Sequence, residues 1–129
     1  MGFENIRPGD IFCQRGNGKG LLIDLRQRAD YRNSHVPGAV CIPYEELRQS
    51  IPKLRNWYDQ CMRRFGSASL IVYCDRGNTS LRAARDLNNQ GFYVKNVYGG
   101  ISAYQGPRAD QNGMLIIPNS VVDGTGKSR

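Results

Sequence analysis

The chain has 129 residues, enough for one domain and too few for two separate hydrophobic cores. Hydrophobic residues make up 40% and charged residues 22%, and no apolar run approaches the roughly 20 residues that span a bilayer. These features exclude a membrane-spanning protein and predict a soluble domain without a membrane partner. The first residues lack the basic stretch and apolar core of a secretory signal, so the expected location is the cytoplasm.

The formal net charge of +7 is compatible with an anionic partner or with a self-repelling surface. Lysines and arginines are scattered, and no aromatic stacking platform lies between them, so we expect no nucleic-acid partner. The four cysteines contain no C-x-x-C pair, and His35 is the single histidine. We therefore expect neither a metal site nor a cofactor.

Short apolar, partly β-branched runs predict strands at residues 21–25, 39–42, 70–73 and 94–98. Between them, residues 30–38 have the pattern of a helical turn that runs into a loop. An amphipathic helix is expected from Glu45 to Phe65, interrupted at Pro52. A further helix follows residue 78, with Thr79 or Ser80 as its cap and Gly91 at its end.

Strands and helices alternate with short connections, which favours an α/β fold with a small parallel sheet flanked by helices on both faces. We expect the domain to cover residues 21–106. Residues 1–20 are then an extension that packs on the domain, and residues 107–129 a partly disordered extension. The apolar residues 114–117 within it either pack on the domain or form an edge strand.

Cys74 is the most informative residue, because it ends a central strand and is followed at once by a polar loop and a helix. Ligands of open α/β sheets bind at such strand ends. Backbone N–H groups of the loop and the positive end of the helix stabilise both an anion and a thiolate. We therefore predict Cys74 as a nucleophile that needs no histidine, whereas Cys13, Cys41 and Cys61 lack this context.

The residues after Cys74 form the predicted substrate-binding loop. Arg76 is its one cation and is expected to help bind an anionic donor, or else to extend into solvent; the acidic Asp75 beside it opposes an anion. Gly77 allows the backbone to turn closely, and the side chains that follow either donate hydrogen bonds to substrate or cap the helix. The last group comprises Asn78, Thr79 and Ser80.

Four segments in order resemble the rhodanese-like sulfurtransferases. They are Leu22–Arg26 with Asp30–Tyr31, His35–Ala39 with Ile42–Pro43, the Cys74–Ser80 loop, and Val97–Ile101. Tyr104 stands where this family commonly has a tryptophan. The resemblance extends from about residue 21 to residue 104 and implies a rhodanese-like fold. It also implies that Asp24 and Arg26 form a buried structural pair and that His35 has a structural role.

The resemblance implies a sulfurtransferase that moves sulfane sulfur from a donor such as thiosulfate or a persulfide to cyanide or a thiol, through a persulfide on Cys74. The expected partners are a small sulfur-containing anion or thiol, and in addition a protein sulfur acceptor. One alternative is a non-catalytic rhodanese-like module that binds a protein or carries sulfur. The other is a related cysteine phosphatase or arsenate reductase, which needs an arginine six residues after the cysteine, where this chain has Ser80.

Overall fold

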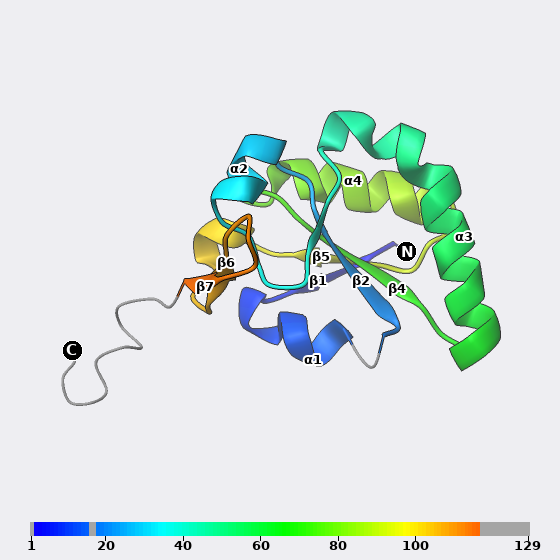
Figure 1. Cartoon of the computed structure of the whole chain (residues 1–129). Coiled ribbons are helices and arrows are strands. Elements are labelled where there is room, and N and C mark those ends of the chain that lie inside the picture. Colours follow the sequence, from blue (N-terminus) through cyan, green and yellow to red (C-terminus); the bar gives the residue numbers. More distant parts are fainter. Residues whose placement is uncertain (1, 16–17, 117–129) are drawn as a thin grey trace.

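The computed structural model describes residues 2–15 and 18–116, and five parallel strands form its main sheet (Figure 1). Their order is β1-β5-β4-β2-β3. The strands are β1 Glu4–Ile6, β2 Gly20–Asp24, β3 Val40–Cys41, β4 Ser69–Tyr73 and β5 Val94–Val97. The helices are α1 Ile11–Arg15, α2 Arg28–Asn33, α3 Leu47–Phe65 and α4 Asn78–Asn89, and the 3-10 turns are η1 Pro8–Asp10, η2 Tyr44–Glu46 and η3 Ile101–Ala103.

The centre of the sheet is β4, in which every residue is buried. It pairs with β2 over five residues, from Gly20 opposite Ser69 to Asp24 opposite Tyr73, and with β5 on its other side. A strand covered on both faces needs apolar residues at successive positions, and Leu70, Ile71 and Val72 provide them. Its carboxyl end therefore lies in the middle of the sheet edge where Cys74 follows.

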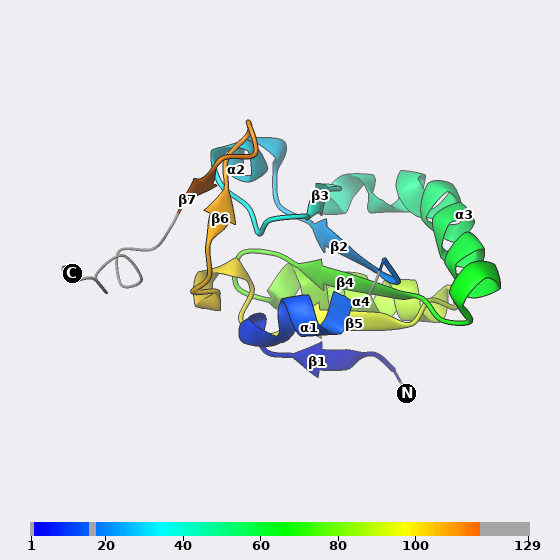
Figure 2. The same ribbon diagram turned by 60° about the horizontal axis from the view of Figure 1, so that its bottom comes forward.

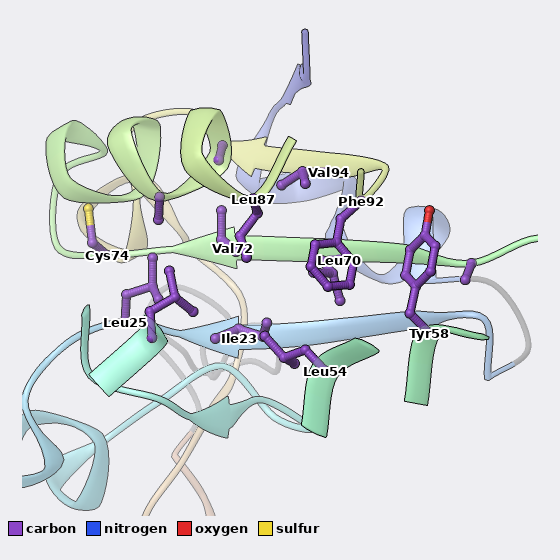
Figure 3. Close-up of a cluster of buried hydrophobic side chains, with 14 of the residues drawn as sticks. Ile23, Leu25, Leu54, Tyr58, Leu70, Val72, Cys74, Leu87, Phe92 and Val94 are labelled. Carbon is purple, nitrogen blue, oxygen red and sulfur yellow. The ribbon is translucent and has the colours of Figure 1, made fainter. Parts of the chain in front are cut away.

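Helices cover both faces of the sheet, which confirms the predicted fold class (Figures 1 and 2). On one face, Leu54 and Tyr58 of α3 and Leu87 of α4 belong to one core cluster with Leu70 and Val72 of β4 (Figure 3). On the other face α1, η3 and the segment after α2 pack against Ile71 and Tyr73; their buried side chains include Ile11, Val36, Ile101 and Tyr104.

The expected interruption at Pro52 is wrong, because α3 continues through this residue as one helix of 19 residues. The missing N–H group of proline removes one intrahelical hydrogen bond. Pro52 is exposed, so the ring does not disturb the packed face, and Leu47, Leu54 and Tyr58 are buried on either side of it. Burial of that face outweighs the local defect.

The N-terminal segment contributes an edge strand that its sequence did not indicate. Glu4–Ile6 forms β1 and pairs in parallel with β5, with Asn5 opposite Asn96. At the other end, Leu115–Ile116 forms β7, which pairs antiparallel with β6, Arg108–Ala109, in a separate two-stranded sheet (Figure 2). Residues 107–116 of the expected, partly disordered extension are described, and residues 117–129 lie outside the described range.

Candidate active site around Cys74

Cys74 lies between the end of β4 and the start of α4, with its sulfur pointing toward that helix (Figure 3). The residue is 6% exposed and belongs to the core cluster that also contains Leu25 and Val72. The cluster holds the strand end in place, while the residues after Cys74 form an exposed loop. The sulfur is thus fixed by packing at the boundary between the core and the surface.

Backbone N–H groups surround the sulfur. The N–H of Gly77 donates to Cys74 Sγ at 3.1 Å and that of Ser80 at 3.2 Å, while the thiol itself donates to Ser80 Oγ at 3.4 Å. Two N–H dipoles at the N-terminus of a 12-residue helix stabilise negative charge on sulfur. These N–H groups can stabilise a thiolate at this position without a histidine.

The expected side-chain cap of α4 by Thr79 or Ser80 is wrong. Gly77 is the residue that caps the helix, and no side chain caps it. The Ser80 hydroxyl instead donates to the Gly77 carbonyl at 3.3 Å and accepts a hydrogen bond from the Cys74 thiol, so Ser80 lies next to the sulfur. Gly77 has φ +106°, and a Cβ here would lie 3.3 Å from the nitrogen of Gly99, so the turn needs glycine.

The segment after β5 holds the loop that follows Cys74. The N–H groups of Ile101 and Ser102 donate to the carbonyls of Cys74 and Asp75, each at 2.9 Å. Gly100 precedes them with φ +64° and ψ −163°, which brings its backbone against the same two carbonyls. The glycine pair at residues 99–100 was visible in the sequence, but its contact with the Cys74 loop was not predicted.

A cavity of about 620 Å³ opens over Cys74. Four predicted loop residues line it, and so does Arg26 from the end of β2; the loop residues are Asp75, Arg76, Asn78 and Thr79. Sequence reasoning missed the rest of the lining, which includes Tyr44 and Glu45 of η2 together with Gln27, Asp30 and Ser102. These residues come from segments distant in sequence, and only the parallel topology brings them to one sheet edge.

Asp24 and Arg26 form an ion pair beneath this cavity. The Arg26 guanidinium donates to Asp24 Oδ2 at 2.8 Å, and the two side chains are 8% and 0% exposed. Tyr73 completes the network: its hydroxyl donates to Asp24 Oδ2 at 2.7 Å and accepts the N–H of Val36 at 3.1 Å. Burial and the neighbouring Asp24 carboxylate raise the pKa of Tyr73, so it remains a hydrogen-bond donor.

His35 lies away from the cavity lining. Its ring stacks on Tyr31 with the centroids 3.7 Å apart, and Nδ1 lies 2.7 Å from the Tyr31 carbonyl oxygen. Its backbone pairs with Ala109 in an isolated bridge. These contacts join α2 to β6.

All four cysteines lie in the described residues and carry free thiols; Cys61 is buried, Cys41 is half-buried and Cys13 is exposed. In residues 2–15 and 18–116, no cluster of three or more His, Cys, Asp or Glu side chains is placed to hold a metal ion. No helix in this part of the chain combines the length and apolarity needed to cross a membrane.

The residues around Cys74 fall within a match to a known family. The model of the rhodanese-like domain matches residues 13–107, which is more than half of the chain. The chain belongs to this family. The match contains the expected domain of residues 21–106, whose boundaries stay a prediction, and it includes part of the segment that precedes β2.

Similar proteins include enzymes and a solved structure. The rhodanese-like domain is 34% identical over 85 residues to thiosulfate sulfurtransferase 16 of Arabidopsis thaliana, covering 64% of this chain and 71% of that protein. It is 24% identical over 114 residues to tRNA uridine(34) hydroxylase of Salmonella heidelberg, covering 88% of this chain but only 31% of the hydroxylase. A rhodanese from E. coli solved with anions superposes with a TM-score of 0.56 at 25% identity, covering 70% and 98% of the two chains.

Proposed function

We propose that the chain is a sulfurtransferase that carries sulfane sulfur on Cys74. The observation that carries this proposal is the position of Cys74 Sγ, which accepts two backbone N–H groups at the base of a 620 Å³ cavity. A persulfide sulfur attached to Cys74 would extend into that cavity. Similarity to a thiosulfate sulfurtransferase at 34% identity supports the same chemistry.

The reaction has two displacement steps. The Cys74 thiolate attacks the outer sulfur of the donor, a new S–S bond forms, and the old bond to that sulfur breaks with its electron pair on the leaving group. With thiosulfate the leaving group is sulfite, and with a persulfide it is a thiolate. The acceptor, cyanide or a small or protein-borne thiolate, then attacks the terminal sulfur and releases Cys74 as the thiolate. A reducing compartment such as the cytoplasm suits the free thiol.

The charges of the cavity favour a donor that is not a dianion. Its lining carries two arginines and three carboxylates, a net charge of −1, although the whole chain has a net charge of +7. Of the arginines, Arg26 is already paired with the buried Asp24, so Arg76 is the cation left to meet a substrate. We propose a low-molecular-weight persulfide, such as cysteine persulfide, as a better donor than thiosulfate.

Intact mass spectrometry tests the proposed function. Wild-type protein incubated with cysteine persulfide or thiosulfate should gain about 32 Da, the mass of one sulfur atom, and cyanide should remove the adduct. Cys74→Ser should show no adduct, although Cys13, Cys41 and Cys61 are still present. A folded wild-type protein that gains no mass from either donor contradicts sulfur transfer.

The charge argument has its own test in Asp75→Asn. A unit charge about 10 Å from a dianion changes its rate of capture roughly fourfold in water at low salt, and less at physiological ionic strength. We expect Asp75→Asn to raise kcat/KM for thiosulfate by this factor and to raise that for cysteine persulfide less, because cysteine persulfide carries less negative charge than thiosulfate. Asp59→Asn makes the same charge change on α3, outside the cavity lining, and serves as the control. Equal effects of the two substitutions, or no effect of Asp75→Asn, contradict the proposed role of charge.

A module that carries sulfur without turnover of its own is the second candidate. Its support is the tRNA uridine(34) hydroxylase, in which the part that matches this chain is only 31% of a longer protein. Such a module would form the Cys74 adduct but transfer it to small thiols or cyanide only slowly.

Phosphatase chemistry has less support, because position 80 holds a buried serine and the guanidinium of Arg82 lies 6.0 Å from the Tyr44 ring centroid.

A further inference from the structure

A second cavity, of about 420 Å³, lies on the other side of the catalytic loop. Arg76 and Asn78 line both this cavity and the one over Cys74, and Gly77 lines the second one. The rest of the lining includes Asn5 of the edge strand β1 and Asn96 of the neighbouring strand β5. The two cavities are thus separated by the loop whose N–H group at Gly77 donates to Cys74 Sγ.

Asn96 gives this cavity an unused hydrogen-bonding group. The residue lines the cavity although it is only 2% exposed. Its Nδ2 donates to Asn5 Oδ1 at 3.0 Å, whereas Oδ1 is the one buried side-chain nitrogen or oxygen among the described residues that has no hydrogen-bond partner. Buried polar groups in proteins nearly always have partners, and Val94, two residues earlier in β5, is apolar and fully buried. An acceptor retained at this position is suited to a ligand that donates an N–H group.

The other residues of the cavity indicate a planar, nitrogen-containing ligand. Carboxamides recognise the edge of a nucleobase, because they accept one hydrogen bond and donate another in one plane. Asn5, Asn78 and Asn96 line this cavity, and the hydrogen bond between Asn96 and Asn5 leaves an N–H of Asn5 and the Oδ1 of Asn96 as one donor and one acceptor for a base edge. Tyr98, which is 70% exposed, offers an aromatic face on which a base can stack. Arg76 adds a cation for a phosphate group.

We propose that this second cavity binds a nucleotide, with its base on Asn96 and Tyr98 and its phosphate near Arg76. The ligand would contact Gly77 and Asn78 on the side of the loop away from Cys74. Its binding would then affect the Gly77 N–H that donates to Cys74 Sγ without occupying the cavity over Cys74. The proposal is independent of sulfur transfer, since it needs no reaction at Cys74. The same base and phosphate occur in a free nucleotide and in an RNA strand.

The test is a ¹⁵N NMR titration of the full chain with UMP and AMP, with ribose 5-phosphate as the control that lacks a base. We expect at least one nucleotide to shift the Gly77 backbone amide and the Asn96 side-chain amide, and ribose 5-phosphate to shift neither. A single-stranded uridine pentanucleotide in place of UMP distinguishes the sources: tighter binding identifies an RNA strand, and equal or weaker binding a free nucleotide. No shift with either nucleotide at about 10 mM, or equal shifts with ribose 5-phosphate, overturns the proposal.

Two variants and a matched control locate the binding. Asn96→Leu keeps the shape of the side chain and removes the unpartnered acceptor, and Tyr98→Ala changes an exposed side chain that the fold does not need. Each should weaken nucleotide binding at least about tenfold while sulfur uptake by Cys74 is retained. Tyr93→Ala removes an exposed tyrosine beyond the other end of β5 and should leave binding unchanged. Wild-type affinity in Tyr98→Ala, or in folded Asn96→Leu, overturns the proposal.

Discussion

Gly100→Ala probes the contact that holds the catalytic loop in place. Gly100 has φ +64° and ψ −163°, a conformation almost confined to glycine, which costs another residue about 1–3 kcal/mol. A Cβ at this position would also lie 2.5 Å from the carbonyl oxygens of both Cys74 and Asp75. Because these are backbone atoms, no side-chain rotation relieves the clash, and the loop itself must move.

The size of the effect follows from comparison with Gly66→Ala. Gly66 ends α3 with φ +77°, and a Cβ there meets nothing within 4 Å, so alanine costs only the left-handed conformation, about 1 kcal/mol. For Gly100→Ala we expect a loss of about 3 kcal/mol or more, since strain and the clash add. Displacement of Cys74 by a fraction of an ångström should also slow persulfide formation about 10- to 100-fold.

Two measurements separate these effects. Urea unfolding followed by circular dichroism gives the free energy of unfolding of both variants, and the rate of the roughly 32 Da mass gain gives sulfur uptake at Cys74. Gly66→Ala should keep the wild-type rate, because Gly66 does not line the cavity. The reasoning is refuted if Gly100→Ala loses no more stability than Gly66→Ala and takes up sulfur at the wild-type rate.

Two further predictions concern the surroundings of the site. Tyr73→Phe removes a buried hydrogen bond to Asp24 and should lower the free energy of unfolding by about 3 kcal/mol. Tyr98→Phe, at an exposed position, should lower it by less than about 0.5 kcal/mol, and equal losses in urea unfolding contradict the network. Burial, and secondarily Asp24, raises the pKa of Cys41, so its thiolate forms only at higher pH. Peptide mapping after iodoacetamide treatment at pH 8 should therefore show Cys41 labelled more slowly than the exposed Cys13 and catching up as the pH rises; equal rates at pH 8 contradict this.

The central strands could be predicted because buried strands are rich in apolar residues, and that composition is visible locally in the sequence. Residues 21–25 and 70–73 are short, mainly apolar runs, and residues 94–98 have valines on both sides of a polar pair. The structure has strands at all three places within one residue at each end. The edge strand Glu4–Ile6 could not be predicted, since two of its three residues are exposed. It exists through its pairing with β5, and that partner is about 90 residues away in sequence.

From the sequence, only the part of the candidate site that lies in the loop after Cys74 could be predicted. Cys74 and its neighbours follow a strand and precede a helix, so their place at the sheet edge is a local property. The cavity lining at Tyr44 and Glu45, and the hydrogen bonds from Ile101 and Ser102, depend on segments brought together by the topology. A local pattern also misassigned Ser80, whose hydroxyl is a good helix cap in general but here lies next to the sulfur.

The groups that stabilise negative charge at Cys74 are mainly backbone N–H groups, which side-chain substitution leaves in place. The reactivity of the sulfur therefore depends on the path of the loop, and that path depends on Gly77, Gly100 and the packing beneath β4. The exposed side chains Asp75 and Arg76 face the cavity without bonding to the sulfur. Substitutions of these side chains should then change which donors react fastest, whereas substitutions of the glycines should slow all donors alike, because they displace the sulfur and its N–H groups together.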